Sequence, residues 1–334
     1  MVYLTFDAFQ NFDWPPAEIV LSPGKFVHDH FCVLPYELSE TLPGDGGDLV
    51  VLLGGRDRDE KFGELREYPG RVVVVFGPQD LSIGDEFEPP GRGLPPNVAS
   101  VYGTNVELTD QRALALPLGV NRGKLRQLRF VRRNHSGVRD GLVYGSFAIT
   151  NMRRDRRGIV GPPHRAMLAR QLEDKPWATL DVFAAWRDDP AQLLDYYSQI
   201  ARHRFTLSPE GFGVDCHRTW ESLYLGSIPI VLRSTAMSSF GDLPILFVDD
   251  YGELSEEYLE HSWEEMSGRS YDLTKLTRSH YLRHFESSVS SLTSPRFICW
   301  RSSTWPGERF ARALEASRHP LPELPSDLSC EANG

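Results

Sequence analysis

The chain has 334 residues, 40% of them hydrophobic and 11% aromatic, which is enough for two domains with sizeable cores. Its formal net charge of −10 argues against a nucleic-acid partner, because such proteins normally present a basic face. No stretch reaches the roughly 20 apolar residues that a membrane-spanning helix needs. The four cysteines have no metal-binding spacing, so we expect them to be reduced.

Short apolar runs in the first half predict parallel strands that are buried on both faces. The clearest are residues 48–53 (DLVVLL) and 71–76 (RVVVVF), and residues 97–102 and 113–118 are weaker cases. We expect a first strand over residues 2–6, ending at Asp7, and a loop over residues 10–23. His28, Asp29 and His30 then stand where a helix could begin.

The boundary between the two halves is strongly basic. Its cations are Arg122, Lys124, Arg126, Arg129, Arg132 and Arg133. A solvated linker or helix is the simpler interpretation, and a binding patch is the alternative. His135-Ser136-Gly137 is the expected hinge.

The second half starts again with a predicted strand over residues 142–149. We expect helices over residues 163–174, which include Arg165, and from Asp189-Pro190 to about residue 203. After the stretch discussed next, a strand is expected over residues 243–248, and helices over residues 254–266, 271–289 and 305–318. Residues 321–334 should form a loose tail.

The most informative stretch is residues 204–233, RFTLSPEGFGVDCHRTWESLYLGSIPIVLR. It predicts a strand, a loop with two glycines, a helix and a second strand. Asp215 is the expected N-cap of the helix, and Gly226 is a suitable C′ residue because glycine adopts positive φ freely. The loop thus leads into a helix N-terminus, where free N–H groups and the helix dipole favour an anion.

Arg218 and Glu221 are three residues apart, so they share one side of this helix. A guanidinium and a phosphate cradle can hold a diphosphate, and a carboxylate can accept hydrogen bonds from ribose hydroxyls. The pattern therefore predicts a nucleotide site. The alternative is an ordinary α/β unit with an Arg–Glu surface pair.

The same stretch resembles the exostosin-like pattern of GT-B glycosyltransferases, F-x-L-x-P-x-G, then R-x-x-E-[AS]-L, then G-x-I-P-[IV]-[VI], in order, spacing and residue types. The resemblance implies two Rossmann-like domains with parallel sheets facing a central cleft. Residues 1–136 would bind the acceptor and residues 137–320 the donor, with the helix over residues 305–318 returning to the first domain.

The resemblance implies transfer of a sugar from a nucleotide-diphosphate sugar to an acceptor hydroxyl. It favours a UDP-sugar as the donor, and it implies inversion at the sugar carbon without a metal ion or cofactor. The donor would be bound by residues of the loop and the helix and by arginines of the second half. These residues are Pro209, Gly211, Phe212, Gly213, Val214, Asp215, Arg218, Glu221, Arg153 and Arg165.

An inverting transfer needs a general base for the acceptor hydroxyl. The choices in the first half are Asp7, His28, Asp29 and His30. Asp57-Arg58-Asp59 matches the D-x-D metal motif of GT-A enzymes, but it lies far in sequence from the donor residues, and we interpret it as a polar turn.

Two alternatives share the donor site, namely a nucleotide-sugar epimerase and a non-catalytic nucleotide-sugar or glycan-binding protein. The alternatives for the acceptor are a glycan, a lipid-linked glycan and a small molecule. Many exostosin-like proteins are membrane-anchored, whereas this sequence enters VYLTF directly, so we expect a cytoplasmic enzyme.

Overall fold

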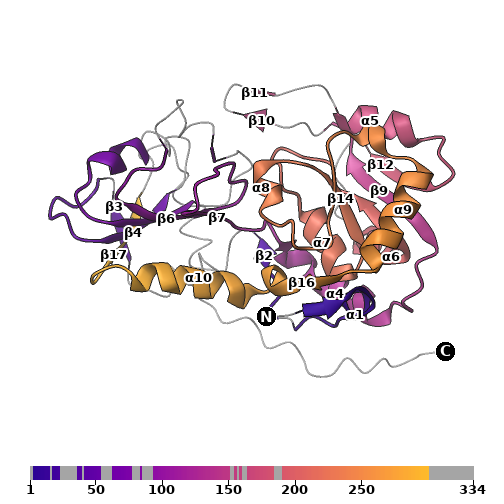
Figure 1. Cartoon of the computed structure of the whole chain (residues 1–334), viewed down its shortest axis with the longest axis horizontal. Coiled ribbons are helices and arrows are strands. Elements are labelled where there is room, and N and C mark those ends of the chain that lie inside the picture. Colours follow the sequence, from indigo (N-terminus) through magenta and orange to yellow (C-terminus); the bar gives the residue numbers. More distant parts are fainter. Residues whose placement is uncertain are drawn as a thin grey trace.

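The computed structural model describes residues 3–15, 17–22, 36–39, 41–53, 62–76, 83–84, 93–150, 154–155, 158–159, 164–183 and 190–300. These residues form an α/β fold with two parallel sheets, each Rossmann-like. The sheets lie in two halves along the long axis of the molecule (Figure 1). None of the helices in these ranges is long and apolar enough to cross a membrane.

The first sheet has six parallel strands in the order β3-β17-β4-β5-β6-β7. The strands are β3 (Tyr36–Ser39), β17 (Arg296–Trp300), β4 (Leu49–Leu53), β5 (Val72–Phe76), β6 (Val98–Gly103) and β7 (Ala113–Ala115). Every residue of β4 and β5 is buried, as their unbroken apolar runs predict for central parallel strands. The expected strands over residues 48–53, 71–76 and 97–102 are thus confirmed, and that over residues 113–118 is shorter.

The second sheet has five parallel strands in the order β12-β9-β13-β14-β15. They are β12 (Ala178–Phe183), β9 (Gly141–Ala148), β13 (His203–Leu207), β14 (Ile228–Leu232) and β15 (Leu246–Val248). In chain order this is the 2-1-3-4-5 arrangement of flavodoxin-like sheets. The order reverses between β9 and β13, which is where such sheets bind ligands at the carboxyl ends of their strands.

Helices pack mainly around the second sheet. They are α4 (Leu125–Asn134), α5 (His164–Leu172), α6 (Pro190–Arg202), α7 (His217–Leu225), α8 (Thr235–Ser238) and α9 (Glu256–Ser267). The basic stretch before the expected hinge is therefore largely a helix, and α4 packs against α6 and α7. The division at residue 136 stays a prediction, although α4, which precedes it, lies against the second half.

Both ends of the described chain cross to the other half. β1 (Tyr3–Thr5) pairs antiparallel with β16 (Ser270–Asp272), and α1 (Phe6–Asn11) contacts α9. At the other end, α10 (Arg278–Ser290) leads into β17 of the first sheet. The expected helix over residues 271–289 is thus wrong in its first turns, and the expected helix over residues 305–318 lies outside the described residues.

Short pairings complete the fold. They join β2 (Leu21–Ser22) to β8 (Val120–Asn121) in parallel and β10 (Arg154–Asp155) to β11 (Gly158–Ile159) antiparallel. Single 3-10 turns cover Leu65–Glu67, Arg122–Lys124, Tyr251–Glu253 and Leu273–Leu276. The β2–β8 pair brings the start of the chain next to the segment that follows β7.

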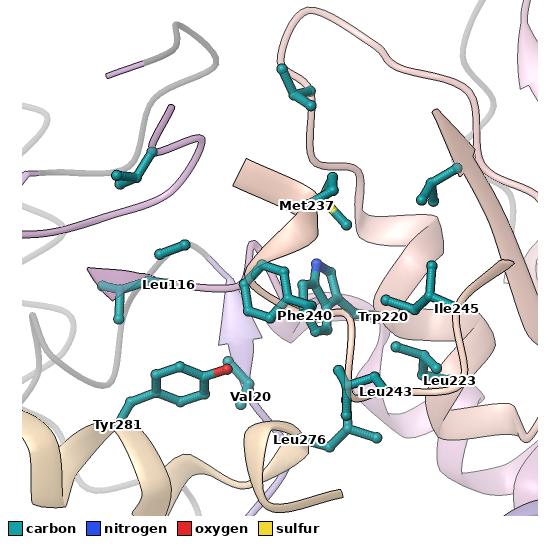
Figure 2. Close-up of a cluster of buried hydrophobic side chains, with 14 of the residues drawn as sticks. Val20, Leu116, Trp220, Leu223, Met237, Phe240, Leu243, Ile245, Leu276 and Tyr281 are labelled. Atoms are coloured by element: carbon teal, nitrogen blue, oxygen red, sulfur yellow. The ribbon is translucent and has the colours of Figure 1, made fainter. Parts of the chain in front are cut away.

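A hydrophobic cluster around Trp220 connects the two halves. The Trp220 ring is fully buried and meets the Phe240 ring edge-on, with centroids 4.8 Å apart. Figure 2 shows Val20 and Leu116 from the first half and Tyr281 of α10 in the same cluster. The core therefore continues from one half to the other beside α7.

Candidate functional site

The loop between β13 and α7 lies at the point where the strand order of the second sheet reverses. β13 ends at Leu207, β9 ends next to it at Ala148, and α7 begins at His217. The residues from Ser208 to Asp215 are buried except Phe212, which is 37% exposed. The carboxyl ends of β9 and β13 and the N-terminus of α7 thus meet at one place, as the sequence pattern predicts.

Arg165 of α5 holds the start of this loop. Its Nε donates to Glu210 O (2.8 Å), its Nη2 to Pro209 O (2.9 Å) and its Nη1 to Ala148 O (3.2 Å). A Cβ on Gly211 would stand 3.2 Å from Arg165 Nη2, so a glycine permits this close approach. Because all three nitrogens bind carbonyls, Arg165 positions the loop, and this geometry differs from the expected direct contact with a diphosphate.

Asp215 joins the loop to the first half of the chain. Its Oδ2 accepts from the backbone N–H of Leu118 (2.7 Å), and its own N–H donates to Asn105 Oδ1 (2.8 Å). Both carboxylate oxygens also lie within hydrogen-bond distance of Trp220 Nε1. The expected N-cap role is wrong, because Cys216 is the N-cap residue and Asp215 is engaged by the segment after β7.

The Asp215 carboxyl is buried, and its hydrogen-bond partners among the described residues are N–H groups with no cation among them. Burial raises its pKa to about 7, although the N–H donors oppose the shift. The neighbouring His217 adds a second link between the halves, from its Nδ1 to Gly119 O (2.7 Å). The loop is therefore anchored on one side by Arg165 and on the other by the segment after β7.

Arg218 is the unusual residue of the site. It lies in the first turn of α7 and is 7% exposed, yet its Nε and Nη1 have no hydrogen-bond partner in the described part of the chain. Its guanidinium lies over the Phe147 ring, with Cζ 5.9 Å from the ring centroid. Buried N–H groups of a cation are costly to leave without partners, and in the described part of the chain two of those of Arg218 have none.

Unlike the Arg218 guanidinium, the Glu221 carboxylate has hydrogen-bond partners for both of its oxygens. It is 4% exposed, and its two oxygens accept from the hydroxyls of Tyr196 (2.8 Å) and Tyr197 (3.0 Å) on α6. The structure shows no ion pair between Glu221 and Arg218 among the described residues, so the alternative of a simple surface pair does not hold. The expected role of Glu221 was to accept hydrogen bonds from ribose hydroxyls. In the structure, both carboxylate oxygens instead accept from tyrosine hydroxyls.

Tyr251, which follows β15, was not predicted from the sequence. Its hydroxyl is buried without a hydrogen-bond partner among the described residues. Burial raises the pKa of Tyr251, and the charge of Glu210 adds to the shift, so the hydroxyl stays protonated and can donate. Arg165 and Arg218 are close enough to influence the same hydroxyl, which places a second free polar group at this end of the sheet.

The remaining predicted donor residues divide into two groups. Pro209, Gly211, Gly213 and Val214 are buried parts of the loop, and Phe212 is its exposed tip. Gly211 N–H donates to Gly213 O (3.0 Å), which gives the loop a tight turn. Arg153 lies outside the described residues.

Of the predicted bases, the structure describes Asp7, which it does not bring together with Arg218. His28, Asp29 and His30 lie outside the described residues, as does Asp57-Arg58-Asp59. Asp7 is exposed in α1, where the sequence predicted a strand end. The nearby Gln10 side chain donates to Gly226 O, at the opposite end of α7 from Arg218. Within the described ranges, no group of three or more His, Cys, Asp or Glu residues could hold a metal ion.

Sequence reasoning missed Phe147 and Tyr251 because each is an ordinary aromatic residue at a strand end. The only available signal was position, since both lie at the carboxyl ends of second-half strands. No family model matches the sequence, and a search of curated proteins finds no match. The residues of the loop and of α7 are therefore the features of this chain that point to a function.

Proposed function

We propose that this protein is a glycosyltransferase with a GT-B arrangement, which moves a sugar from a nucleotide-diphosphate donor, UDP by resemblance, to an acceptor hydroxyl. The observation that carries the proposal is the buried Arg218 at the N-terminus of α7, whose Nε and Nη1 have no hydrogen-bond partner among the described residues. An anion with several oxygens, such as a diphosphate, would satisfy its free N–H groups. The position between β9 and β13 supports the same conclusion, because α/β sheets bind nucleotides there.

The roles of the site residues follow from their contacts. Arg218, the N–H groups of the first turn of α7 and the Tyr251 hydroxyl would contact the diphosphate. They would stabilise the charge that develops on the leaving group, without a metal ion. Arg165 and Asp215 hold the loop in place, and Glu221 fixes α7 against α6 through Tyr196 and Tyr197.

We propose that the general base is one of three residues, His28, Asp29 or His30. The last described element before them is β2, which pairs with β8. β8 follows Gly119 directly, and the Gly119 carbonyl contacts His217 at the start of α7. The chain therefore leaves β2 beside the candidate site, whereas Asp7 lies at the other end of α7. Alanine variants of these three residues should lower turnover far more than donor binding.

A panel of UDP, GDP, dTDP and CDP, screened by thermal shift and calorimetry, tests the proposal. We expect one nucleotide to stabilise the wild type by mass action and Arg218→Ala to weaken its binding by about 30- to 1,000-fold, as for a truncated buried charge. The matched control is Arg202→Ala, an exposed arginine paired with Asp140 away from the loop. It should bind like the wild type.

The outcomes separate the transferase from its alternatives. Transfer of the sugar to an added acceptor supports the proposal. Interconversion of a nucleotide sugar without any acceptor would show an epimerase. Binding without turnover over many acceptors would show a binding protein. If no nucleoside diphosphate binds, the proposal fails.

A further inference from the structure

Helix α4 carries a basic face that the proposed function does not use. Its ten residues, LRQLRFVRRN, contain four arginines and no acidic residue, in a chain whose net charge is −10. Arg126, Arg129 and Arg133 recur at intervals of three and four residues, so they form one stripe along the helix. Phe130 stands beside this stripe and is 54% exposed.

The opposite face of α4 explains its structural role. Leu128 and Val131 are buried where α4 packs against α6 and α7. Arg132, on the inner side, donates to the carbonyls of Phe12, Gln10 and Leu225. The inner side of α4 is thus packed against the fold, whereas Arg126 and Arg133 are exposed on the outer side and Arg129 is half-buried between them.

The charges of the stripe are hardly neutralised. Arg126 has no ion pair among the described residues, and Arg129 Nε is buried without a partner. Burial and the repulsion of Arg133 lower the pKa of Arg129. Arg133 has one ion pair, with Asp13 at 3.6 Å, and both side chains are more than half exposed, so the pair is weak. An anionic partner would supply the missing counter-charges.

We propose that the outer face of α4 docks the protein onto an anionic lipid bilayer. An exposed phenylalanine beside arginines on a helix face is the combination that suits a bilayer interface, where the ring enters the headgroup region and the arginines meet the lipid charges. Three arginines at such a surface together raise partitioning by roughly a hundredfold. A soluble polyanion would also bind the arginines, but it would make no use of Phe130.

The geometry separates docking from the candidate site. Arg132 of α4 binds the Leu225 carbonyl at the C-terminal end of α7, whereas Arg218 lies in its first turn. Figure 1 shows α4 beside α1, below the second sheet. The docked protein would therefore keep its candidate site away from the bilayer. Nucleotide binding should be the same with and without vesicles, so the two proposals can fail independently.

Co-sedimentation with vesicles of phosphatidylcholine, alone or with 30% phosphatidylglycerol (a composition chosen on the order of that of anionic membranes), tests the inference. We expect binding only to the anionic vesicles, and loss of binding on the order of tenfold or more when salt is raised to about 0.5 M. The double variant Arg126→Glu/Arg133→Glu should lose at least about 30-fold in affinity. Phe130→Ser should lose about five- to tenfold.

The control is Arg269→Glu, an exposed arginine after α9 whose ion pair is with Glu265. It should bind anionic vesicles within about twofold of the wild type, which distinguishes a local face from general charge. Circular dichroism and thermal unfolding check that each variant is folded. Absence of binding to anionic vesicles would overturn the inference. So would an equal loss in the control, or an unchanged affinity of Phe130→Ser.

Discussion

Replacing Arg165 with methionine should destabilise the protein by about 3–5 kcal/mol, because three buried carbonyls lose their donor at once. These are the carbonyls of Ala148, Pro209 and Glu210, and the last two belong to the loop that precedes α7. Chemical unfolding followed by circular dichroism measures the change. The same variant should bind a diphosphate more weakly, because the loop is no longer held.

Two further variants make this test specific. Arg165→Lys keeps the charge but cannot reach all three carbonyls, so its stability should lie between those of the wild type and the methionine variant. Arg170→Met, on the exposed side of the same helix, should change the free energy of unfolding by less than about 0.5 kcal/mol. A loss below about 1 kcal/mol for Arg165→Met would contradict the positioning role.

The second large effect is a pH dependence that belongs to Asp215. Its pKa in the folded protein is about 7 against a usual 3.8, so the folded state binds a proton that the unfolded state has already released. Stability from this group is complete below pH 4 and is lost as the pH rises toward and through 7. Relative to Asp215→Asn, the wild type should lose about 2–3 kcal/mol between pH 5 and 8.

The comparison with Asp215→Asn isolates this group, because all other titrations are common to both proteins. The asparagine amide faces the N–H donors of Leu118 and Trp220, so the variant also has a constant, pH-independent loss. Unfolding free energies at four pH values separate the slope from the offset. Parallel profiles for the two proteins would show that Asp215 is ionised throughout and would contradict the account.

The sequence predicted those parts of the fold that depend on local pattern. The unbroken apolar runs of β4 and β5 are typical of strands buried on both faces, and both strands are present. β12, by contrast, is a short edge strand with mixed exposure, and its sequence, ATLDVF, has no unbroken apolar run of the kind seen in β4 and β5. β17 pairs with strands more than 200 residues earlier, and no local pattern indicates such a pairing.

The candidate site shows the same division. Arg218, Gly211 and the N-terminus of α7 were predictable, because motif and helix lie in one short stretch. The role of Asp215 was not, because its partner Leu118 lies 97 residues away and replaces the expected helix cap. Glu221 was predicted as a ligand-binding carboxylate, but α6 brings Tyr196 and Tyr197 onto both of its oxygens. Such contacts between distant elements cannot be read from residue spacing.

Arg218 is the central residue of the proposed site, as a buried cation that we propose is available to an anion. Thermal unfolding of the wild type and of Arg218→Met, each with and without inorganic pyrophosphate, tests this point. We predict that ligand-free Arg218→Met is more stable than the wild type, by about 1–3 kcal/mol, since a desolvated charge without partners is removed. Pyrophosphate should then stabilise the wild type alone. A ligand-free variant that is less stable than the wild type, with no effect of pyrophosphate on either protein, would show that Arg218 is structural and would contradict the account.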